Sequence, residues 1–327
     1  MTRVLLAMPR GGFNDMLCQL ESCARAAEAS GRLLVVDTRQ SGLGSGPGTD
    51  LFDSFDLAPG QRMMRVADWD GEVTVGPGRV EVIHEGIPTV WQVSPDDPAL
   101  RHDRDQPQDA PVLLHYSAGG GELGVHFLAR LRLKPALCAR ILAARRAVGG
   151  RYAAVHVRHT DYRTDYAAAF ALIARRMRGW RLLICSDSEA PVEYFARTHG
   201  DSFDWTTSAA ARSTDLRPLH LDDRGRGAER NAEMLTDLYL LASAERVVMV
   251  DTLNSKRSGF AVLAAHMRRR LDVAALDRGA EGDAALELKP RLPLWLHSLR
   301  GNPFRVWRLR RLADRSGWPL ILHPTPE

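Results

Sequence analysis

The sequence RYAAVHVRHTD, residues 151–161, decides how the rest of the chain is interpreted. It begins as a run of small and apolar residues of strand length, and it ends in a cation, two imidazoles and a carboxylate: His156, Arg158, His159 and Asp161. A strand that is apolar on both faces is typical of a buried parallel sheet. Ligands of open α/β sheets bind at the carboxyl ends of the strands. The segment therefore predicts a parallel strand that ends in a functional site.

A purely structural interpretation of the same residues also stands. His156 would then be a hydrogen-bonded histidine of a buried strand, and Arg158 with Asp161 would be a surface ion pair. Structural ion pairs gather charged residues as functional sites do. Three polar residue types within six positions, directly after a strand, favour the site.

Composition sets the broad class of the protein. A chain of 327 residues exceeds one typical core, so we expect two domains. The hydrophobic fraction of 45% and the charged fraction of 26% are those of an ordinary soluble protein. The net charge of +4 is small for this length, which argues against a nucleic-acid partner.

The cysteines and the N-terminus indicate a cytoplasmic protein. The four cysteines show no C-x-x-C pair and no metal-ligand spacing, and each lies in an apolar segment: Cys18, Cys23, Cys138 and Cys185. Such residues are typical of reduced core positions. We see no export signal and no run of roughly 20 apolar residues that would span a membrane.

Two D-x-D triplets, at residues 68–70 and 103–105, could hold a divalent metal under a sugar diphosphate. Both stand in hydrophilic turns without a clear strand before them. We therefore predict no metal site and no cofactor.

The chain opens as a β-loop-α-β unit. A strand at residues 3–8 is followed by Gly11 and Gly12, by a helix that Asn14 can cap, and by a strand at 32–36. The glycine pair either leaves backbone N–H groups open to an anion or only satisfies the geometry of a tight turn.

The remaining pattern predicts a doubly wound parallel sheet, because strands and helices alternate through the second half. Short strands in residues 72–90, with a hairpin around 76–78, and a strand at 112–116 precede a helix from Pro135 to Gly149. After the strand at residue 151, the expected elements are helices at 167–177, 191–198, 232–242 and 259–269 and strands at 181–185 and 247–250.

Three regions follow from this pattern. Residues 1–145 form an N-terminal Rossmann-like domain, and residues 146–275 form a second one. Residues 276–327 form a basic, aromatic tail that either packs back on the protein or lies on an anionic membrane surface.

Four blocks of the sequence resemble the GDP-fucose-dependent fucosyltransferases, a family that includes bacterial nodulation fucosyltransferases and the α-1,6-fucosyltransferase of N-glycan cores. They are RGGFNDMLCQL at residues 10–20, HVRHTD at 156–161, ICSDS at 184–188 and DLYLLASAERVVMVDTLNS at 237–255. The resemblance implies a GT-B fold, in which two Rossmann-like doubly wound domains face a cleft. It also implies a metal-independent reaction that inverts the sugar anomer.

The resemblance assigns roles to residues of this chain. Arg158 would hold the β-phosphate of the donor, and Asp161 or Asp165 would supply the base, although the family's acidic residue falls at Tyr166, one position from Asp165. The donor-binding residues implied in the same way are Gly11, Gly12, His156, His159, Asp187, Asp237, Asn254 and Ser255. His159 stands where many members of the family have arginine.

The expected function is fucose transfer from GDP-fucose to a glycan or to a lipid-linked sugar acceptor. The expected location is cytoplasmic, with the tail as a candidate contact to the inner membrane. Three alternatives remain at this point: a GT-B-like protein that binds a nucleotide sugar or glycan without catalysis, a transferase that uses another nucleotide sugar, and a metal-dependent transferase that uses a D-x-D triplet.

Overall fold

The computed structural model describes residues 2–41, 50–93, 100, 106–210, 212–214, 227–253, 257–270 and 320–322. The chain divides into two compact units, Met1–Arg132 with Asp223–Ala228 and Leu133–Asp222 with Glu229–Glu327. The division precedes helix α3 (Pro135–Val148), so this helix belongs to the second unit. The boundary predicted near residue 145 falls inside α3, whose glycine stop marks the end of a helix and not the end of a domain.

The first unit is built on a parallel sheet in the order β4-β2-β1-β8. Its strands are β1 (Val4–Pro9), β2 (Leu33–Val36), β4 (Met63–Arg65) and β8 (Val112–Ser117). Val4 of β1 pairs with Leu33 on one side and with Val112 on the other. Every residue of β1 and β8 is buried, which explains their continuous apolar sequence.

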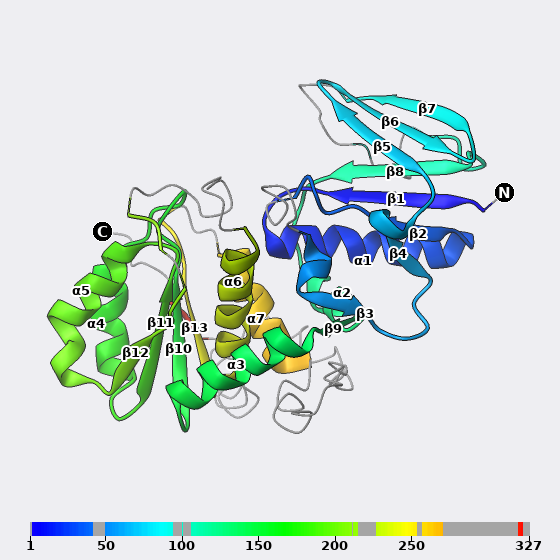
Figure 1. The fold of residues 1–327 in the computed structure, drawn as a ribbon. Helices are drawn as coiled ribbons and strands as arrows, with labels where there is room; N and C mark the ends of the chain where they lie inside the picture. Colours follow the sequence, from blue (N-terminus) through cyan, green and yellow to red (C-terminus); the bar gives the residue numbers. More distant parts are fainter. Residues whose placement is uncertain are drawn as a thin grey trace, which may run out of the picture. The chain divides into compact units, whose positions relative to one another are not determined.

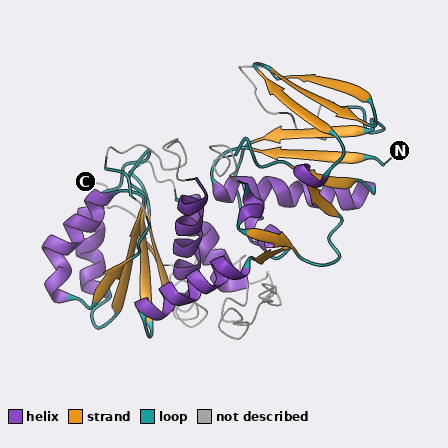
Figure 2. Cartoon of the chain, in the orientation of Figure 1, coloured by secondary structure: helices purple, strands orange, loops and turns teal. Residues whose placement is uncertain are grey.

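Two different layers cover this sheet, as Figures 1 and 2 show. Helix α1 (Phe13–Ser30) lies on one face. An antiparallel meander of β5 (Glu72–Gly76), β6 (Arg79–His84) and β7 (Ile87–Gln92) lies on the other. Val80 and Val82 of β6 join the core with alternate residues of β1. The hairpin predicted at residues 76–78 is confirmed, and the meander takes the place that a helix has in a doubly wound sheet.

Short elements complete the first half of the chain. They are η1 (Leu51–Asp53), β3 (Phe55–Leu57), η2 (Val66–Asp68), α2 (Gly124–Leu128) and β9 (Leu131–Leu133), of which β3 and β9 pair.

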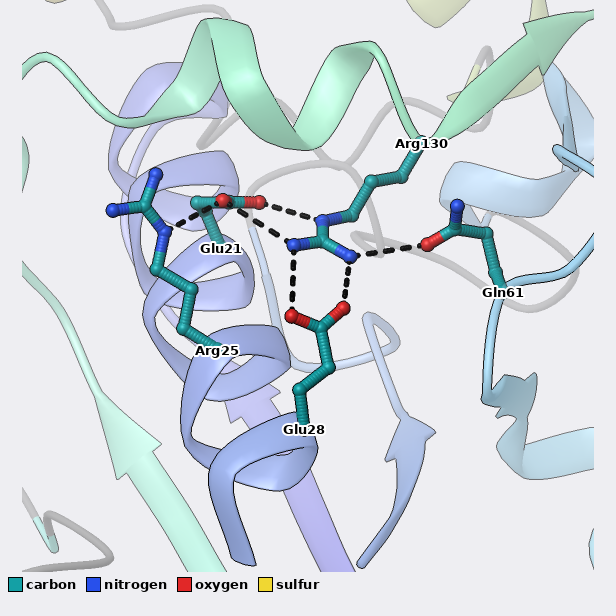
Figure 3. A network of polar contacts seen from close by, with 5 residues as sticks. All are labelled: Glu21, Arg25, Glu28, Gln61 and Arg130. Atoms are coloured by element: carbon teal, nitrogen blue, oxygen red, sulfur yellow. Dashed lines mark hydrogen bonds and ion pairs between the residues drawn. The ribbon is translucent and has the colours of Figure 1, made fainter. Parts of the chain in front are cut away.

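Arg130 fastens helix α1 to the segments around it (Figure 3). Its Nε donates to Glu21 Oε2 at 2.8 Å, Nη1 donates to Gln61 Oε1 at 3.1 Å, and the guanidinium also binds the carboxylate of Glu28. Arg25 donates to the other oxygen of Glu21 at 2.8 Å. The side chain of Glu21 is only 3% exposed, so these arginines compensate a buried charge.

The second unit is a parallel sheet in the order β12-β11-β10-β13-β14. Its strands are β10 (Tyr152–Val157), β11 (Arg181–Ser186), β12 (Trp205–Thr207), β13 (Arg246–Val250) and β14 (Leu320–Leu322). The run at residue 151 is thus the central, fully buried strand that the sequence predicts.

Helices lie on both faces of this second sheet, as expected for a doubly wound fold (Figure 1). On one face are α4 (Tyr166–Arg176) and α5 (Glu189–His199), whose residues Phe170 and Phe195 pack on β10 and β11. On the other face are α3, α6 (Gly227–Ser243) and α7 (Gly259–Arg270). The short helix η3 (Gly200–Ser202) follows α5.

The structure corrects three details of the predicted elements. Gly12, not Asn14, is the N-cap of α1, and Asn14 is a buried helix residue that donates to the carbonyl of Gly121 at 3.1 Å. Residues 205–207 form β12, at a place where the sequence predicts no helix or strand. Within the tail, residues 320–322 form β14, which pairs with β13. The rest of the predicted tail from residue 276 lies outside the described residues.

None of the helices in the described part of the chain is both long and apolar enough to cross a bilayer.

Candidate functional site

The carboxyl ends of three neighbouring strands form the candidate site of the second unit. β10 lies between β11 and β13, and His156 pairs in register with Cys185 on one side and with Met249 on the other. The polar turn after β10 therefore lies beside Asp187, which follows β11, as the alternation of strands and helices predicts.

Asp187 holds the turn that follows β10. Its Oδ1 accepts a hydrogen bond from the backbone N–H of His159 at 2.7 Å, and its Oδ2 accepts one from Thr160 Oγ1 at 2.7 Å. Burial raises the pKa of Asp187, more than these hydrogen bonds and the charge of Arg158 lower it. The contacts of Asp187 shown by the structure are thus with the neighbouring turn.

Arg158 forms a two-point ion pair with Asp161. Its Nε donates to Oδ1 at 2.8 Å, and its Nη2 donates to Oδ2 at 2.5 Å. The guanidinium also lies over the ring of Tyr162, 4.5 Å from the ring centroid. Among the described residues, none accepts a hydrogen bond from Nη1. The ion pair of the structural interpretation is therefore present, and it uses Nε and Nη2 of the guanidinium but not Nη1.

Asp161 is held in its charged form by this pair. Burial alone would raise the pKa of Asp161, but the hydrogen bonds and the charge of Arg158 outweigh burial, and the pKa is lowered. Both carboxylate oxygens are engaged. A carboxylate in this state is a weak base.

His156 is buried, and its Nδ1 has no hydrogen-bond partner among the described residues. Its ring lies against Phe260 of α7, with 5.4 Å between the ring centroids. Burial and the charge of Arg158 lower the pKa of His156 to about 4, so the imidazole is neutral. The structural interpretation requires a hydrogen-bonded histidine, and the described residues supply no such partner for Nδ1.

His159 stabilises the turn after β10 through contacts with other residues of the same segment. Its Nδ1 accepts from the backbone N–H of Thr164 at 3.2 Å, and its ring meets the edge of Tyr166, 4.8 Å away between centroids. Thr164 Oγ1 donates to the carbonyl of Arg158 at 2.5 Å. Burial and the charge of Arg163 lower the pKa of His159. The structure thus shows His159 in contacts within the turn.

Asp165 is the N-cap of α4. Its Oδ1 accepts from the backbone N–H of Ala168 at 3.0 Å, which satisfies one of the free amides of the first turn. The side chain is exposed, and Oδ2 has no partner among the described residues.

Asp237 of α6 is a buried carboxyl group. Its Oδ2 accepts from Ser208 Oγ at 2.8 Å. Burial raises the pKa of Asp237 to about 7, against the lowering effect of Ser208 and Arg212. Arg212 in turn holds the segment of Ser208, since it donates to Thr207 Oγ1 and to the carbonyl of Ser208.

In the first unit, Gly11 and Gly12 follow β1 directly. Gly11 has a φ of +95°, and a Cβ atom there would lie 3.1 Å from Oδ2 of Asp15. Glycine is therefore required by the turn itself. Whether its amides also bind an anion stays a prediction.

Some of the remaining predicted residues, and one of the two D-x-D triplets, fall outside the described part of the chain. Asn254 and Ser255 lie outside the described residues, as does the triplet at 103–105. In the other triplet, Asp68 is paired with Arg65 at 2.7 Å and Trp69 is buried. Within the described residues, no group of three or more His, Cys, Asp or Glu side chains is arranged so that it could hold a metal ion.

Sequence reasoning missed the contacts that organise the site. Thr160 and Thr164 fix the turn around Arg158, and Ser208 binds Asp237. The position of Thr160 within HVRHTD was a usable signal. Ser208 follows a three-residue strand in a polar stretch, and nothing in the sequence connects it with Asp237.

Comparisons with known proteins identify the fold. No protein-family model matches the chain, and no curated protein matches its sequence. Fucosyltransferase NodZ from Bradyrhizobium is 17% identical, with a TM-score of 0.56 over 83% of this chain and 94% of that chain. NodZ α-1,6-fucosyltransferase co-crystallised with GDP gives 0.54 at 17% identity, over 81% and 92% of the two chains. The form soaked with GDP-fucose gives 0.54 at 18% identity, over 89% and 100%.

The chain has the fold of these proteins. The α/β class with two parallel sheets and the GT-B type are therefore confirmed. At these identities the likeness establishes the fold, and the roles of the individual residues remain predictions.

Proposed function

We propose that the protein is a metal-independent, inverting glycosyltransferase that transfers fucose from GDP-fucose to a glycan or lipid-linked acceptor. The likeness in fold to NodZ structures that were crystallised with GDP or soaked with GDP-fucose supports a GDP-sugar as donor. The observation that carries the proposal is the guanidinium of Arg158 at the carboxyl end of β10, beside the buried His156. Among the described residues, none accepts a hydrogen bond from Nη1 of Arg158, and none is a hydrogen-bond partner of Nδ1 of His156.

The chemistry explains why a fixed guanidinium is useful there. In an inverting transfer, the acceptor oxygen attacks C1 of the sugar from the face opposite the phosphate. The bond from C1 to the phosphate oxygen breaks, and its electron pair leaves with GDP. Negative charge therefore grows on the β-phosphate in the transition state. A preorganised arginine binds this state more strongly than the ground state and takes the part that a metal ion has in other transferases.

A base must accept the proton of the acceptor hydroxyl, and we propose Asp165 rather than Asp161 for this role. Both oxygens of Asp161 accept hydrogen bonds from Arg158, whereas Oδ2 of the exposed Asp165 has no partner among the described residues. A base must reach the hydroxyl within roughly 3 Å, which an exposed side chain at the rim of the site can do.

The decisive experiment is the substitution Arg158→Ala. Fucose transfer from GDP-fucose should fall by ~10²-fold or more, since that is the usual cost of losing a preformed charge contact in the transition state. Arg176→Ala, which changes an exposed arginine at the far end of α4, is the matched control and should keep full activity. A variant Arg158→Ala that retains more than about a tenth of the rate would contradict the role of Arg158. Activity that disappears in EDTA and returns with a divalent cation would contradict metal independence.

A second candidate function is nucleotide-sugar binding without catalysis. Two contacts favour this second function: Asp161 is paired with Arg158, and Asp165 caps α4. Both carboxylates then have a structural role that does not require catalysis. Release of free fucose, or transfer in an acceptor screen, separates the two functions.

The donor can be tested independently of activity. In a thermal-shift screen of GDP, UDP, ADP and their sugars, a ligand at 100 times its Kd should add about 2.7 kcal/mol of stability. Only guanine nucleotides should do so. The proposal includes a cytoplasmic location, which the four free, buried cysteines support.

A further inference from the structure

We propose that Asp187 is a positioning residue that sets the direction of the Arg158 side chain, and that it is not a ligand of the donor nucleoside. The inference rests on the proposed role of Arg158 at the β-phosphate. It departs from the role that sequence resemblance implies for Asp187.

The carboxylate of Asp187 accepts hydrogen bonds from the two residues that follow Arg158. One oxygen accepts from the backbone N–H of His159, and the other accepts from the hydroxyl of Thr160, both at 2.7 Å. A hydrogen bond to a charged carboxylate is stronger than one between neutral groups. The peptide plane that joins Arg158 to His159 is therefore tied to β11 through Asp187.

The opposite side of the same peptide is tied as well. The carbonyl of Arg158 accepts from Thr164 Oγ1 at 2.5 Å. Thr164 is itself placed by its N–H, which donates to Nδ1 of His159 at 3.2 Å. With its carbonyl and the next amide both held, the backbone of Arg158 has one orientation, and its Cβ leaves the turn in one direction.

Asp187 is in turn held in place by its own backbone. The N–H of Ser213 donates to the carbonyl of Asp187 at 2.9 Å, and the N–H of Glu189 donates to the carbonyl of Ser213 at 3.1 Å. The N–H of Ser188 donates to Ser186 Oγ at 3.1 Å. These hydrogen bonds fix the backbone of Asp187 and therefore the position of its carboxylate. A positioning residue must be fixed in this way.

Because of the salt bridge to Asp161, the orientation of the Arg158 side chain has to be fixed by these hydrogen bonds. Asp161 competes with a phosphate for the guanidinium of Arg158, and it uses the Nε and Nη2 edge. A phosphate must therefore approach Arg158 from the Nη1 side. A small rotation of the backbone at residues 158–161 would direct Nη1 away from the phosphate. A misplacement of about 1 Å can cost on the order of 10²-fold in rate.

The test compares GDP with GMP, which lacks the β-phosphate. Asp187→Ala should weaken GDP binding about tenfold, as measured by calorimetry, and should leave GMP binding unchanged. In an Arg158→Ala background, Asp187→Ala should cause no further loss of GDP affinity, because a positioning residue acts only through the arginine it positions. Equal losses of GMP and GDP affinity, or losses that add in the double variant, would show a direct nucleoside contact and overturn the inference.

A second pair of variants leaves the carboxylate in place. Thr160→Val removes one of its two donors and should lower kcat about three- to tenfold with little change in the KM for donor, whereas Thr160→Ser keeps the hydroxyl and should restore the rate. Unchanged kcat in Thr160→Val, or no recovery in Thr160→Ser, would also overturn the inference. If Arg158→Ala itself binds GDP and transfers fucose normally, the proposed function fails; if Arg158→Ala is inactive while the Asp187 effects add, only the positioning role fails.

Discussion

At the scale of single residues, two buried groups of the second unit have pKa shifts that act in opposite directions on stability. Burial raises the pKa of Asp237 from 3.8 to about 7 and lowers the pKa of His156 from 6.5 to about 4. Between pH 3.8 and about 7, Asp237 is therefore protonated in the native protein and ionised in the unfolded chain. Between pH 4 and 6.5, His156 is neutral in the native protein and protonated in the unfolded chain. Between pH 4 and 6.5 the two effects oppose each other.

Replacing Asp237 by asparagine should reveal this opposition. Because the folded pKa of Asp237 is raised, its effect reduces stability as pH rises from about 4 to about 7 and is constant above that. Asp237→Asn keeps an acceptor for Ser208, and relative to wild type it should gain stability over this window, by roughly 4 kcal/mol at most.

Urea unfolding at several pH values from 4.5 to 8 measures the difference. His156→Gln is the opposite control. The lowered pKa of His156 costs stability as pH falls from 6.5 toward 4, so this variant should lose that dependence. A difference between Asp237→Asn and wild type that does not change with pH would show that Asp237 is charged in the native state.

Asp165 offers a separate test at the same scale. Asparagine is as good an N-cap as aspartate, so Asp165→Asn should leave α4 and the unfolding free energy unchanged. As the proposed base, however, it should lose activity by about 10²- to 10⁴-fold in kcat. Asp165→Ala would lose the cap as well and should be less stable by about 1 kcal/mol. An active Asp165→Asn variant would return the role of base to Asp161.

At the scale of elements, α1 of the first unit depends on an ion-pair network as well as on its apolar face. Arg130 should be the critical member, because it binds both Glu21 and Glu28 and is only 17% exposed. Arg130→Met leaves Glu21 buried with Arg25 alone, and we expect a loss of about 3 kcal/mol in the unfolding free energy of the first unit.

Two further variants show whether the loss comes from the buried charge. Arg25→Gln removes a partner that is 49% exposed, and it should cost less than about 1 kcal/mol. Adding Glu21→Gln to Arg130→Met should recover part of the stability, because it removes the uncompensated charge. A denaturation curve of Arg130→Met that overlays the wild-type curve would show that α1 is held by packing alone.

Elements with long buried runs were predictable from the sequence. β1, β10, β11 and β13 each have a short, continuous apolar run whose residues are almost all buried in the structure, and a run of this length bounded by turn residues is typical of a buried strand. β12 was not predicted, because it has three residues in a polar stretch. The start of α1 was misplaced because its N-cap is Gly12, which has no side chain to signal a cap.

At the scale of the whole molecule, the sequence predicted the α/β architecture and which strand ends meet. It did not predict that a meander would cover one face of the first sheet, because the pairing of Val80 and Val82 with the β1 layer depends on packing between distant segments. In the same way, the neighbourhood of Asp187 and Thr160 followed from strand order, whereas the hydrogen bonds between them did not. Local patterns fix elements, and contacts distant in sequence need the assembled fold.

The order of strands in the first sheet has a consequence for how the protein is made. β1 has β2 on one side and β8 on the other, and β8 begins only at Val112, after the complete meander. While the ribosome is still synthesising residues 37–111, the second edge of β1 has no partner in its own sheet. Such an apolar edge, VLLAMP, invites pairing with other nascent chains. The meander forms from neighbouring hairpins and can fold quickly, so it is suited to cover the apolar face of β1 early, whereas the open edge of β1 is paired only when β8 emerges from the exit tunnel.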